Sequence, residues 1–513
     1  MIRKIQKLLK EKEGELFAVN CSSLKEAEEL LKDLGKMGYC WYDDSVPVTD
    51  ENGELSRTEF DAEKGSTAYY FCNSFPVLLH SRKQFFKKNC VEVIEFSSIK
   101  NNAALEYKCD LNKVTYVEIF DKNAIKNICS ALAQAPKKII LVGTNADEMK
   151  KACKTYLRIL GGGEIQIECK AYKNRIPDIV NALSDIVETE EECCFDITGG
   201  SDTFLVALGT VFEKYRNRNV QIHRFNIEEQ TITDCDDDGV TPFRKFPALS
   251  VEDNICIYGG KVVSESITGA EEINTEELDK LWAIFRKHTP TEWNSAIMIL
   301  MNVTSRCIVR NGDSHYYRID STDEKFSAFM KNGILHEFIA KKIFKRYVVT
   351  SYYIIFEFCD AFVEKCLATS GNLLETKIFS LAVSAKESDG ATPFFHDVKS
   401  GVKMEWEYEH KNNTPTVDNE IDVMAMDGVV PVFISCKNGK FNQEELYKLS
   451  TVANNFGGEY AKKVIVTNDA LSERGNINLK ERALEMGIKT IVNVNKKSDA
   501  QIVSELKKYD IIQ

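Results

Sequence analysis

The sequence lacks the long hydrophobic runs that mark membrane proteins. No apolar run in its 513 residues approaches the roughly 20 residues that a transmembrane helix needs. The first segment, 1–10, carries charges throughout, so it also lacks the continuous apolar stretch of a signal peptide. We therefore expect a cytoplasmic protein that has no membrane partner.

Closely spaced groups of cysteine and histidine are absent as well. The 16 cysteines are scattered without any CxxC pair, and the chain has only 7 histidines. Zinc ribbons and disulfide frameworks need closer grouping than this. We expect reduced cysteines that are mostly buried, as at Cys193 and Cys194, which lie within an apolar strand.

A third missing feature is an excess of positive charge. The net charge of −12 argues against a protein coated with basic residues for nucleic-acid binding. It does not exclude a nuclease, because such binding depends on local basic patches. An acidic metal site would itself add negative charge.

The length and the changes of pattern along the chain predict an α/β multidomain protein. A balance of 43% hydrophobic and 28% charged residues is typical of globular domains. We assign an accessory α/β module of unknown role to 1–105, a Rossmann-like domain to 106–265, a helical connector to 266–365 and a C-terminal α/β domain to 366–513.

Strands and helices alternate in the second of these domains. Continuous apolar strands such as 138–144 are separated by helices, the first of which is predicted over 122–135. Uniformly apolar strands with intervening helices indicate a parallel sheet that is covered on both faces. We expect the strand over 220–225 to close the series.

The connector and the C-terminal domain have different patterns. The connector ends with a helix predicted over 326–344 and a β-rich stretch over 347–358. Helices with a β-ribbon suit a winged helix, although any helical bundle gives a similar pattern. In the C-terminal domain, a helix over 372–383 precedes three strands, a helix from Asn442 and a strand over 463–467, which is the order of a restriction-endonuclease core.

Two strands of this core carry a pattern suited to phosphodiester hydrolysis. Asp422 lies between apolar residues of one strand, and Lys437 ends the apolar strand that follows the turn at 427–428. The reaction needs carboxylates that hold a hard cation and a positive group that orients water or stabilises developing charge. We expect Glu375, Asp422 and the backbone carbonyl of Cys436 to bind Mg²⁺ or Mn²⁺ next to Lys437, as in a PD-(D/E)xK nuclease.

Ser435 departs from the usual pattern, which has Asp or Glu two residues before the lysine. Glu444 or Glu445 from the following helix is a candidate replacement, although Asn442 with Glu445 also forms a good capping box. Glu420 is a further candidate, but we expect its side chain to point away from that of Asp422. The competing interpretation of the whole set is a hairpin with ordinary surface charges.

A second constellation, Asp-Ile-Thr-Gly-Gly-Ser-Asp-Thr over 196–203, lies between a strand and a helix. Ligands of parallel sheets bind at the carboxyl ends of strands, and glycines with free N–H groups at a helix start suit phosphate. The segment lacks both GxGxxG and GxxxxGK[ST]. A dinucleotide cofactor and a nucleotide hydrolase are therefore disfavoured.

The order of the two constellations resembles that of CARF-domain nucleases of type III CRISPR defence. The resemblance rests on Ile-Thr-Gly-Gly at 197–200, Asn-Glu-Ile-Asp-Val at 419–423 and Ile-Ser-Cys-Lys-Asn-Gly at 434–439. It covers about 114–250 and 365–470, and leaves 1–105 outside. The family's active-site Glu, Asp and Lys match Glu375, Asp422 and Lys437, whereas its Glu before Cys-Lys is Ser435.

The resemblance also implies a ligand. A cyclic oligoadenylate, usually the tetra-adenylate, binds across a dimer in that family and switches on the nuclease. A two-fold ligand fits a two-fold interface, so a homodimer is implied. The pocket residues implied here are Thr198, Gly199, Gly200, Ser201, Asp202, Thr203, Asp121, Lys122, Asn123, Gly143, Thr144 and Asn145.

Three functions follow as hypotheses. The first is a ligand-activated, metal-dependent nuclease that cleaves DNA, RNA or both in antiviral defence. The alternative is a CARF-type regulator whose degenerate nuclease domain only binds nucleic acid, which Ser435 and the net charge favour slightly. The third is a repair nuclease that is active without the cyclic nucleotide.

Overall fold

The chain folds into two compact units, Met1–Val114 and Thr115–Gln513. The computed structural model describes all residues except 1–4, 6–7, 9–16, 43–44, 51–52, 62–65, 72–76, 82–84, 87–90, 102–113, 135, 137, 161–164, 216–219, 230, 236–239, 243–247, 265–271, 306–307, 312–313, 407–418, 472–473 and 510–513. Within the described ranges, no helix combines the length and the hydrophobicity that crossing a membrane requires.

The N-terminal unit is an α/β module with its own aromatic core. Its five-stranded sheet has the order β2-β4-β3-β1-β5. The elements are β1 (Phe17–Cys21), α2 (Leu24–Lys36), β2 (Cys40–Trp41), β3 (Thr67–Tyr70), β4 (Val77–Ser81), β5 (Glu92–Glu95) and α4 (Phe96–Asn101). Phe17, Trp41, Tyr69 and Phe71 are fully buried in this core.

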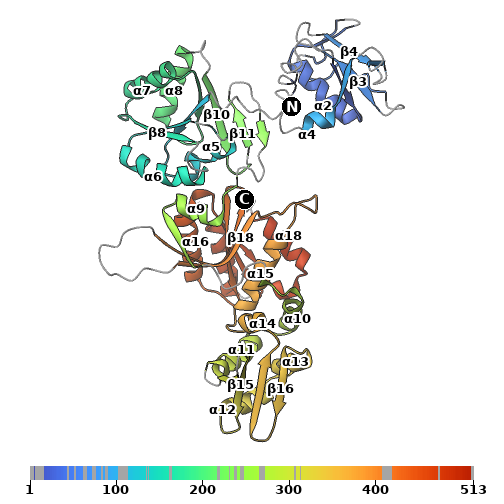
Figure 1. Cartoon of the computed structure of the whole chain (residues 1–513), viewed down its shortest axis with the longest axis vertical. Coiled ribbons are helices and arrows are strands. Elements are labelled where there is room, and N and C mark those ends of the chain that lie inside the picture. Colours follow the sequence, from blue (N-terminus) through green and yellow to red (C-terminus); the bar gives the residue numbers. More distant parts are fainter. Residues whose placement is uncertain are drawn as a thin grey trace. The chain divides into compact units, whose positions relative to one another are not determined.

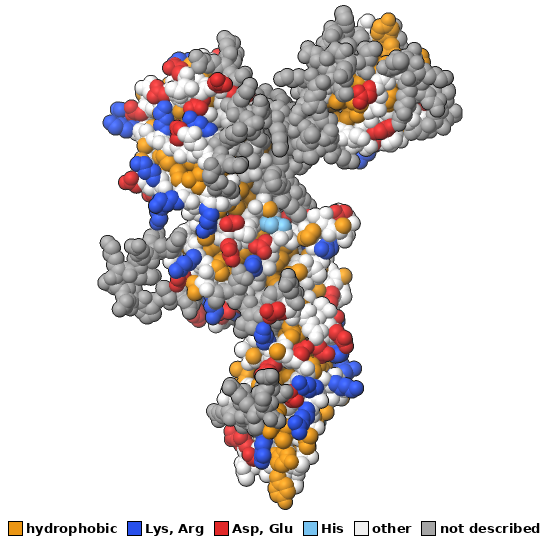
Figure 2. Space-filling model, in the orientation of Figure 1, with side chains coloured by type: hydrophobic (Ala, Val, Ile, Leu, Met, Phe, Trp, Pro, Cys, Tyr) orange, Lys and Arg blue, Asp and Glu red, His pale blue; other side chains and the backbone are white. Residues whose placement is uncertain are grey.

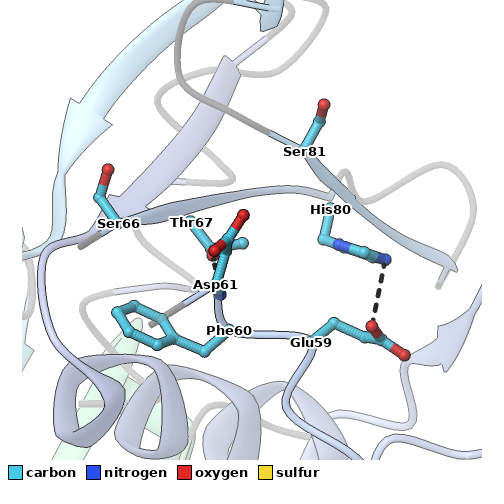
Figure 3. Close-up of a pocket in the computed structure, with 7 residues that line it drawn as sticks. All are labelled: Glu59, Phe60, Asp61, Ser66, Thr67, His80 and Ser81. Carbon is cyan, nitrogen blue, oxygen red and sulfur yellow. Dashed lines mark hydrogen bonds and ion pairs between the residues drawn. The ribbon is translucent and has the colours of Figure 1, made fainter. Parts of the chain in front are cut away.

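This unit has a pocket of about 380 Å³ beside β3 and β4 (Figure 3). His80 Nε2 lies 4.0 Å from a carboxylate oxygen of Glu59, and Thr67 Oγ1 accepts a hydrogen bond from the backbone N–H of Asp61. Neither contact presents a nucleophile together with a base, so we assign no chemistry to this pocket.

The second unit begins with a Rossmann-like domain (Figure 1). Its seven-stranded sheet has the order β12-β11-β10-β9-β6-β7-β8. The elements are β6 (Val114–Ile119), η2 (Ala124–Asn127), α5 (Cys129–Gln134), β7 (Lys138–Gly143), α6 (Ala146–Ile159), β8 (Gln166–Ala171), α7 (Ile176–Thr189), β9 (Glu192–Asp196), α8 (Asp202–Lys214), β10 (Val220–Asn226), β11 (Thr231–Asp234) and β12 (Val240–Pro242).

The parallel sheet is confirmed, with two corrections. Strands β6, β7 and β8 pair in parallel, as do β9 and β10, but β11 and β12 continue the sheet antiparallel beyond the strand that was expected to close it. The single helix predicted over 122–135 is η2 followed by α5. The side chain of Asn127 accepts from the backbone N–H of Asp121 and donates to its carbonyl, which holds this segment as a loop.

The connector has the helix and strand order of a winged helix. Its elements are α10 (Thr275–Phe285), α11 (Pro290–Thr304), β14 (Ile308–Asn311), β15 (Ser314–Asp320), α12 (Glu324–Lys331), α13 (Gly333–Ala340), β16 (Phe344–Val349), β17 (Tyr353–Phe358) and α14 (Ala361–Cys366). The helix predicted over 326–344 is instead two helices. Asn332 ends α12 and caps α13, because its side chain accepts from the N–H groups of Ile334 and Leu335.

The C-terminal domain has the predicted restriction-endonuclease order. Its sheet has the order β13-β18-β19-β20-β21-β22. The elements are α9 (Val251–Ile257), β13 (Gly260–Ser264), α15 (Asn372–Ser384), β18 (Asp397–Trp406), β19 (Asn419–Asp427), β20 (Val430–Lys437), α16 (Gln443–Gly457), β21 (Lys462–Thr467), α17 (Arg474–Glu485), β22 (Ile488–Ile491) and α18 (Asp499–Lys507). Strand β13, from the range predicted for the Rossmann-like domain, pairs with β18.

The connector and the C-terminal domain share one hydrophobic core. Trp282 and Trp293 of the connector belong to the same buried cluster as Ile378 of α15 and Ile434 of β20. Burial of large apolar side chains on both sides fixes the connector against the strands that carry the candidate site.

Two glycines, one in a crowded position and one in an open position, allow a test of the packing. Gly458 has a φ of +68°, and a Cβ there would overlap the hydroxyl group of Tyr258. Gly209 lies on the exposed side of α8, and a Cβ at this position would have no neighbour within 4 Å. We predict that Gly458→Ala destabilises the fold by about 1–3 kcal/mol and that Gly209→Ala stabilises it by about 0.5–1 kcal/mol. Thermal melting checks both signs, and equal melting temperatures would contradict the account.

Candidate active site and ligand pocket

The two predicted strands of the active site pair as expected. In the antiparallel ladder of β19 and β20, Val423 faces Ile434, which brings Asp422 opposite Ser435. Asp422 Oδ2 accepts a hydrogen bond of 3.1 Å from Ser435 Oγ and one of 2.6 Å from the backbone N–H of Cys436. The Asp422 carboxylate is thus held in place by the strand that carries Lys437.

Glu375 lies in the first turn of α15, which packs against β19 and β20. Burial raises the pKa of its carboxyl group to about 7, and the charges of Asp422 and Glu420 add to the increase. A Cβ at position 371 would lie 2.7 Å from Glu375 Oε1, so Gly371 leaves room for this carboxyl group. Glu375 therefore points toward the acidic residues of β19.

Lys437 faces the same site and forms an ion pair of 2.8 Å with Glu445 of α16. Burial alone would lower the pKa of Lys437, but the hydrogen bond with Glu445 and the charge of Asp422 raise it. The lysine is therefore protonated and can orient an anion, whereas it cannot take up a proton. Glu445 reaches the site as the partner of Lys437, while Glu444 is exposed.

The expectation that Glu420 points away from Asp422 is wrong. Residues two apart on a strand share a face, and Ile421 and Val423 are buried on the opposite one. Glu420 is close enough to Glu375 to raise the pKa of that group. The alternation of the strand was the signal that should have identified Glu420 as a member of the site.

These residues suit a divalent cation. Glu375 and Asp422 place like charges together in a half-buried site, a cost that a cation would offset. Within the described ranges, no three His, Cys, Asp or Glu side chains form a complete ligand set. Two carboxylates would thus need the backbone carbonyl of Cys436 and water to complete the shell, which Mg²⁺ accepts readily.

The segment after Lys437 is fixed by an amide network that sequence reasoning did not identify. Asn438 Nδ2 donates to Asn294 Oδ1 of α11 at 2.7 Å and to the carbonyl of Ser370 at 3.2 Å. Asn468 Nδ2 donates to Asn438 Oδ1 at 2.6 Å. Asn438 therefore joins the connector to the strand end that carries the lysine.

The candidate ligand pocket is formed by loops at the carboxyl ends of the parallel strands. Asp121 Oδ2 accepts from the backbone N–H of Gly200 at 3.2 Å, which joins the loops after β6 and β9. Gly200 has a φ of +106°, and a Cβ there would lie 2.8 Å from Ile119 Cγ2. The close approach of these two loops therefore requires glycine at position 200.

Other predicted pocket residues have local structural roles as well. Thr198 Oγ1 accepts from the N–H of Phe225, and Ser201 caps α8. The third predicted loop lies at the end of β7, where Asn145 caps α6. Gly199 packs against Asp121, and Gly143 packs against Phe120. Thr144 and Asp202 are exposed, Lys122 lies in the loop after β6, and Thr203 lies in the first turn of α8.

A joint between the Rossmann-like domain and the C-terminal domain lies next to these loops. The Tyr258 hydroxyl donates to Asn123 Oδ1 at 2.7 Å, and Lys126 pairs with Glu459 at 2.6 Å. A cavity of about 460 Å³ adjoins Tyr258 and is lined in part by Lys122 and Lys151. The sequence offered no pattern for this joint, because its partners are more than 130 residues apart.

The second unit thus combines a Rossmann-like domain, a connector with the helix and strand order of a winged helix, and a domain with the helix and strand order of a restriction endonuclease. Two solved structures share it. Protein VC1899 from Vibrio cholerae matches with a TM-score of 0.59 and 16% identity, over 78% of this chain and 98% of its own. Can2 from Sulfobacillus thermosulfidooxidans, in complex with cyclic tetra-adenylate, matches with a TM-score of 0.53 and 18% identity, over 77% and 99%.

These likenesses establish the fold that the resemblance predicted. A scan of protein-family models gave no match, and a search of curated proteins gave none either. What the chain does must therefore be argued from its own site.

The electrostatic account of Glu375 makes a prediction about stability. At pH 8, above a pKa of about 7, the carboxyl group is charged and unfavourably buried. We predict that Glu375→Gln raises the free energy of unfolding of the metal-free protein by up to about 3 kcal/mol, and with it the melting temperature. The same substitution should remove the stabilisation by Mn²⁺. Glu444→Gln, at an exposed position, should change neither quantity. A lower melting temperature for Glu375→Gln would contradict the account.

Proposed function

We propose that the chain is a metal-dependent nuclease that a cyclic oligoadenylate activates, in type III CRISPR antiviral defence. The observation that carries the proposal is the convergence of Glu375 of α15 with Asp422 and protonated Lys437 of the β19–β20 pair, with Asp422 fixed by the backbone of Cys436. A carboxylate pair beside a cationic side chain is what phosphodiester hydrolysis requires.

The chemistry divides between the cation and the side chains. When bound, Mg²⁺ or Mn²⁺ would polarise the phosphate and lower the pKa of a bound water. Glu375 and Asp422 would hold the cation together with the Cys436 carbonyl. Lys437, kept protonated by Glu445, would stabilise charge on the phosphate oxygens.

Ser435 alters this scheme without abolishing it. Its hydroxyl donates to Asp422, so it orients one metal ligand where the family pattern has a second one. Glu420 shares the face of Asp422 and is our candidate for the compensating carboxylate. Glu445 is disfavoured for that role because it is paired with Lys437.

We assign the ligand to the loops around Gly199, Gly200 and Asp121. The N-terminal end of α8, with its partial positive charge, would face its phosphates. The Can2 structure contains cyclic tetra-adenylate, which we take as the first ligand to test. A two-fold symmetric ligand bound between two copies of the chain would make the protein a homodimer.

A regulator that binds nucleic acid without cleaving it is the second candidate. It is favoured by Ser435 in place of a carboxylate and by the pairing of Lys437 with Glu445. A cleavage assay separates the two candidates.

We predict that the chain cleaves DNA, RNA or both with Mn²⁺ or Mg²⁺, and that cyclic tetra-adenylate increases the rate. Asp422→Ala should abolish cleavage, because it removes the carboxylate that the Cys436 N–H holds in place, while ligand binding persists. Gel analysis of labelled DNA and RNA, with and without ligand and chelator, measures both effects. If no cleavage occurs under any of these conditions, the nuclease function is excluded and the regulator that only binds nucleic acid is the remaining candidate. Equal cleavage without the ligand would indicate a ligand-independent nuclease.

The joint at Tyr258 predicts how activation is transmitted. Tyr258→Phe keeps the ring but removes the hydroxyl that binds Asn123 in the ligand loop. Loss of one such hydrogen bond, about 1 kcal/mol, should lower ligand-dependent stimulation about fivefold. Ligand affinity and stimulation are measured in parallel, with Tyr42→Phe, an exposed tyrosine of the N-terminal unit, as control. Unchanged stimulation in Tyr258→Phe would exclude this route.

A further inference from the structure

The connector sheet has one face in the core and one face exposed. Tyr317, Ile319, Ile354 and Phe356 of β15 and β17 are buried in the shared core. The described part of the opposite face includes eight exposed or half-exposed side chains, which we name the outer sheet face: Tyr316, Arg318, Asp320, Arg346, Val348, Tyr353, Ile355 and Glu357.

The strand register makes these side chains neighbours. Val348 lies opposite Ile355, and Ile355 lies opposite Arg318, so the three form one row across β16, β17 and β15. In the next row, Arg346 lies opposite Glu357. The outer sheet face is therefore continuous over three strands.

Two arginines of this face are stacked on tyrosine rings. The guanidinium of Arg318 lies 4.7 Å from the ring centre of Tyr353, and that of Arg346 lies 5.6 Å from the ring centre of Tyr316. A guanidinium stacked on one side can accept a nucleobase on the other and a phosphate at its edge. Alternating aromatic and cationic side chains on an open sheet are typical of surfaces that bind single-stranded nucleic acid.

The local charge opposes a polyanion less than the charge of the whole chain does. Residues 290–358 contain nine Lys and Arg against seven Asp and Glu, in a chain whose net charge is −12. Figure 2 shows Lys and Arg side chains on the visible surface of the connector, in the lower part of the view. Helix α13 is less suited to bind nucleic acid than the outer sheet face, because its Glu337 already pairs with the two nearby basic side chains, Lys287 and His288.

The two acidic residues of the connector sheet, Asp320 and Glu357, are each paired with a basic side chain. Asp320 accepts hydrogen bonds from Arg318 Nε at 2.9 Å and Nη2 at 2.7 Å. Lys345 pairs with Glu357 at 2.7 Å. A phosphate that binds Arg318 must replace the Asp320 carboxylate, so Asp320 sets a cost for binding.

The face is held at a fixed position relative to the candidate active site. Asn294 of the connector binds Asn438, the residue after Lys437, and both domains share one core. A strand of nucleic acid bound on the connector would thus be tethered to the domain that cleaves it.

We propose that the outer sheet face binds an unpaired segment of the nucleic-acid substrate, outside the catalytic centre. The proposal rests on the proposed nuclease function, whose substrate it specifies as nucleic acid with single-stranded character. A second copy of the chain on this face, and duplex without unpaired bases, are the competing occupants.

The test measures binding of a fluorescent oligothymidylate of about 30 nucleotides, longer than one single-strand site, to the full-length Asp422→Ala protein by anisotropy. We expect the pair Arg318→Ala and Arg346→Ala to weaken binding at least tenfold. We also expect the slope of log Kd against log salt to fall by about 1.4, since each lost phosphate contact on a single strand contributes about 0.7. The matched control, Lys331→Ala with Lys341→Ala, removes two exposed charges from helix ends of the same domain and should leave Kd within twofold.

A gain of affinity gives a second test that misfolding cannot imitate. Asp320→Asn frees Arg318 and should tighten binding severalfold, whereas Glu324→Gln, which removes one charge from an exposed position of the same domain, should not. Unchanged binding in Asp320→Asn overturns the proposal, and so does an equal loss in the helix-end control. If the Arg318 and Arg346 variant changes its oligomeric state while oligothymidylate binding stays the same, the face binds a second copy of the chain. That result would also overturn the proposal.

Failure of this proposal differs from failure of the nuclease function. If wild-type protein cleaves but the Arg318 and Arg346 variant cleaves with the same KM, the face is not the substrate site and the nuclease stands. If the wild type never cleaves while the binding changes occur as expected, the face stands and the protein is a regulator.

Discussion

The close approach of the carboxyl groups of Glu375 and Asp422 is the constraint on which the site depends. Asp422 has two donors, the Ser435 hydroxyl and the Cys436 N–H, that compensate its charge. Glu375 has burial and like charges around it, which raise its pKa to about 7. The fold must hold Glu375 there at a cost in stability, and a bound cation would offset that cost.

The rest of the second unit supplies the rigidity that this requires. Helix α15 is fixed by Lys377, which donates to Asp279 at 3.0 Å and to Asp499 at 2.8 Å from an almost fully buried position. The end of β20 is fixed by the amide network of Asn438. Both contacts lead to the connector, while the Tyr258 joint leads to the loops of the candidate ligand pocket. Tyr258 follows α9, which packs against α16, and α16 carries Glu445, the partner of Lys437.

The sequence predicted what depends on local periodicity, and failed where distant segments meet. Alternation along two strands and one turn was enough to pair Asp422 with the strand of Lys437. The same alternation applied to Glu420 would have placed it correctly. That Glu445 binds Lys437 depends on how α16 packs on the sheet, and that β13 joins β18 depends on a contact across the whole connector. The long helix predicted over 326–344 failed because the Asn332 cap outweighs the helical pattern around it.

The most direct test of the account is the position of a bound manganese ion in crystals of the protein, located by its anomalous scattering. The account predicts a peak between the carboxylates of Glu375 and Asp422, within coordination distance of the Cys436 carbonyl, that disappears in Glu375→Gln. A site that stays empty at millimolar Mn²⁺, or an ion bound elsewhere in the C-terminal domain, would contradict it.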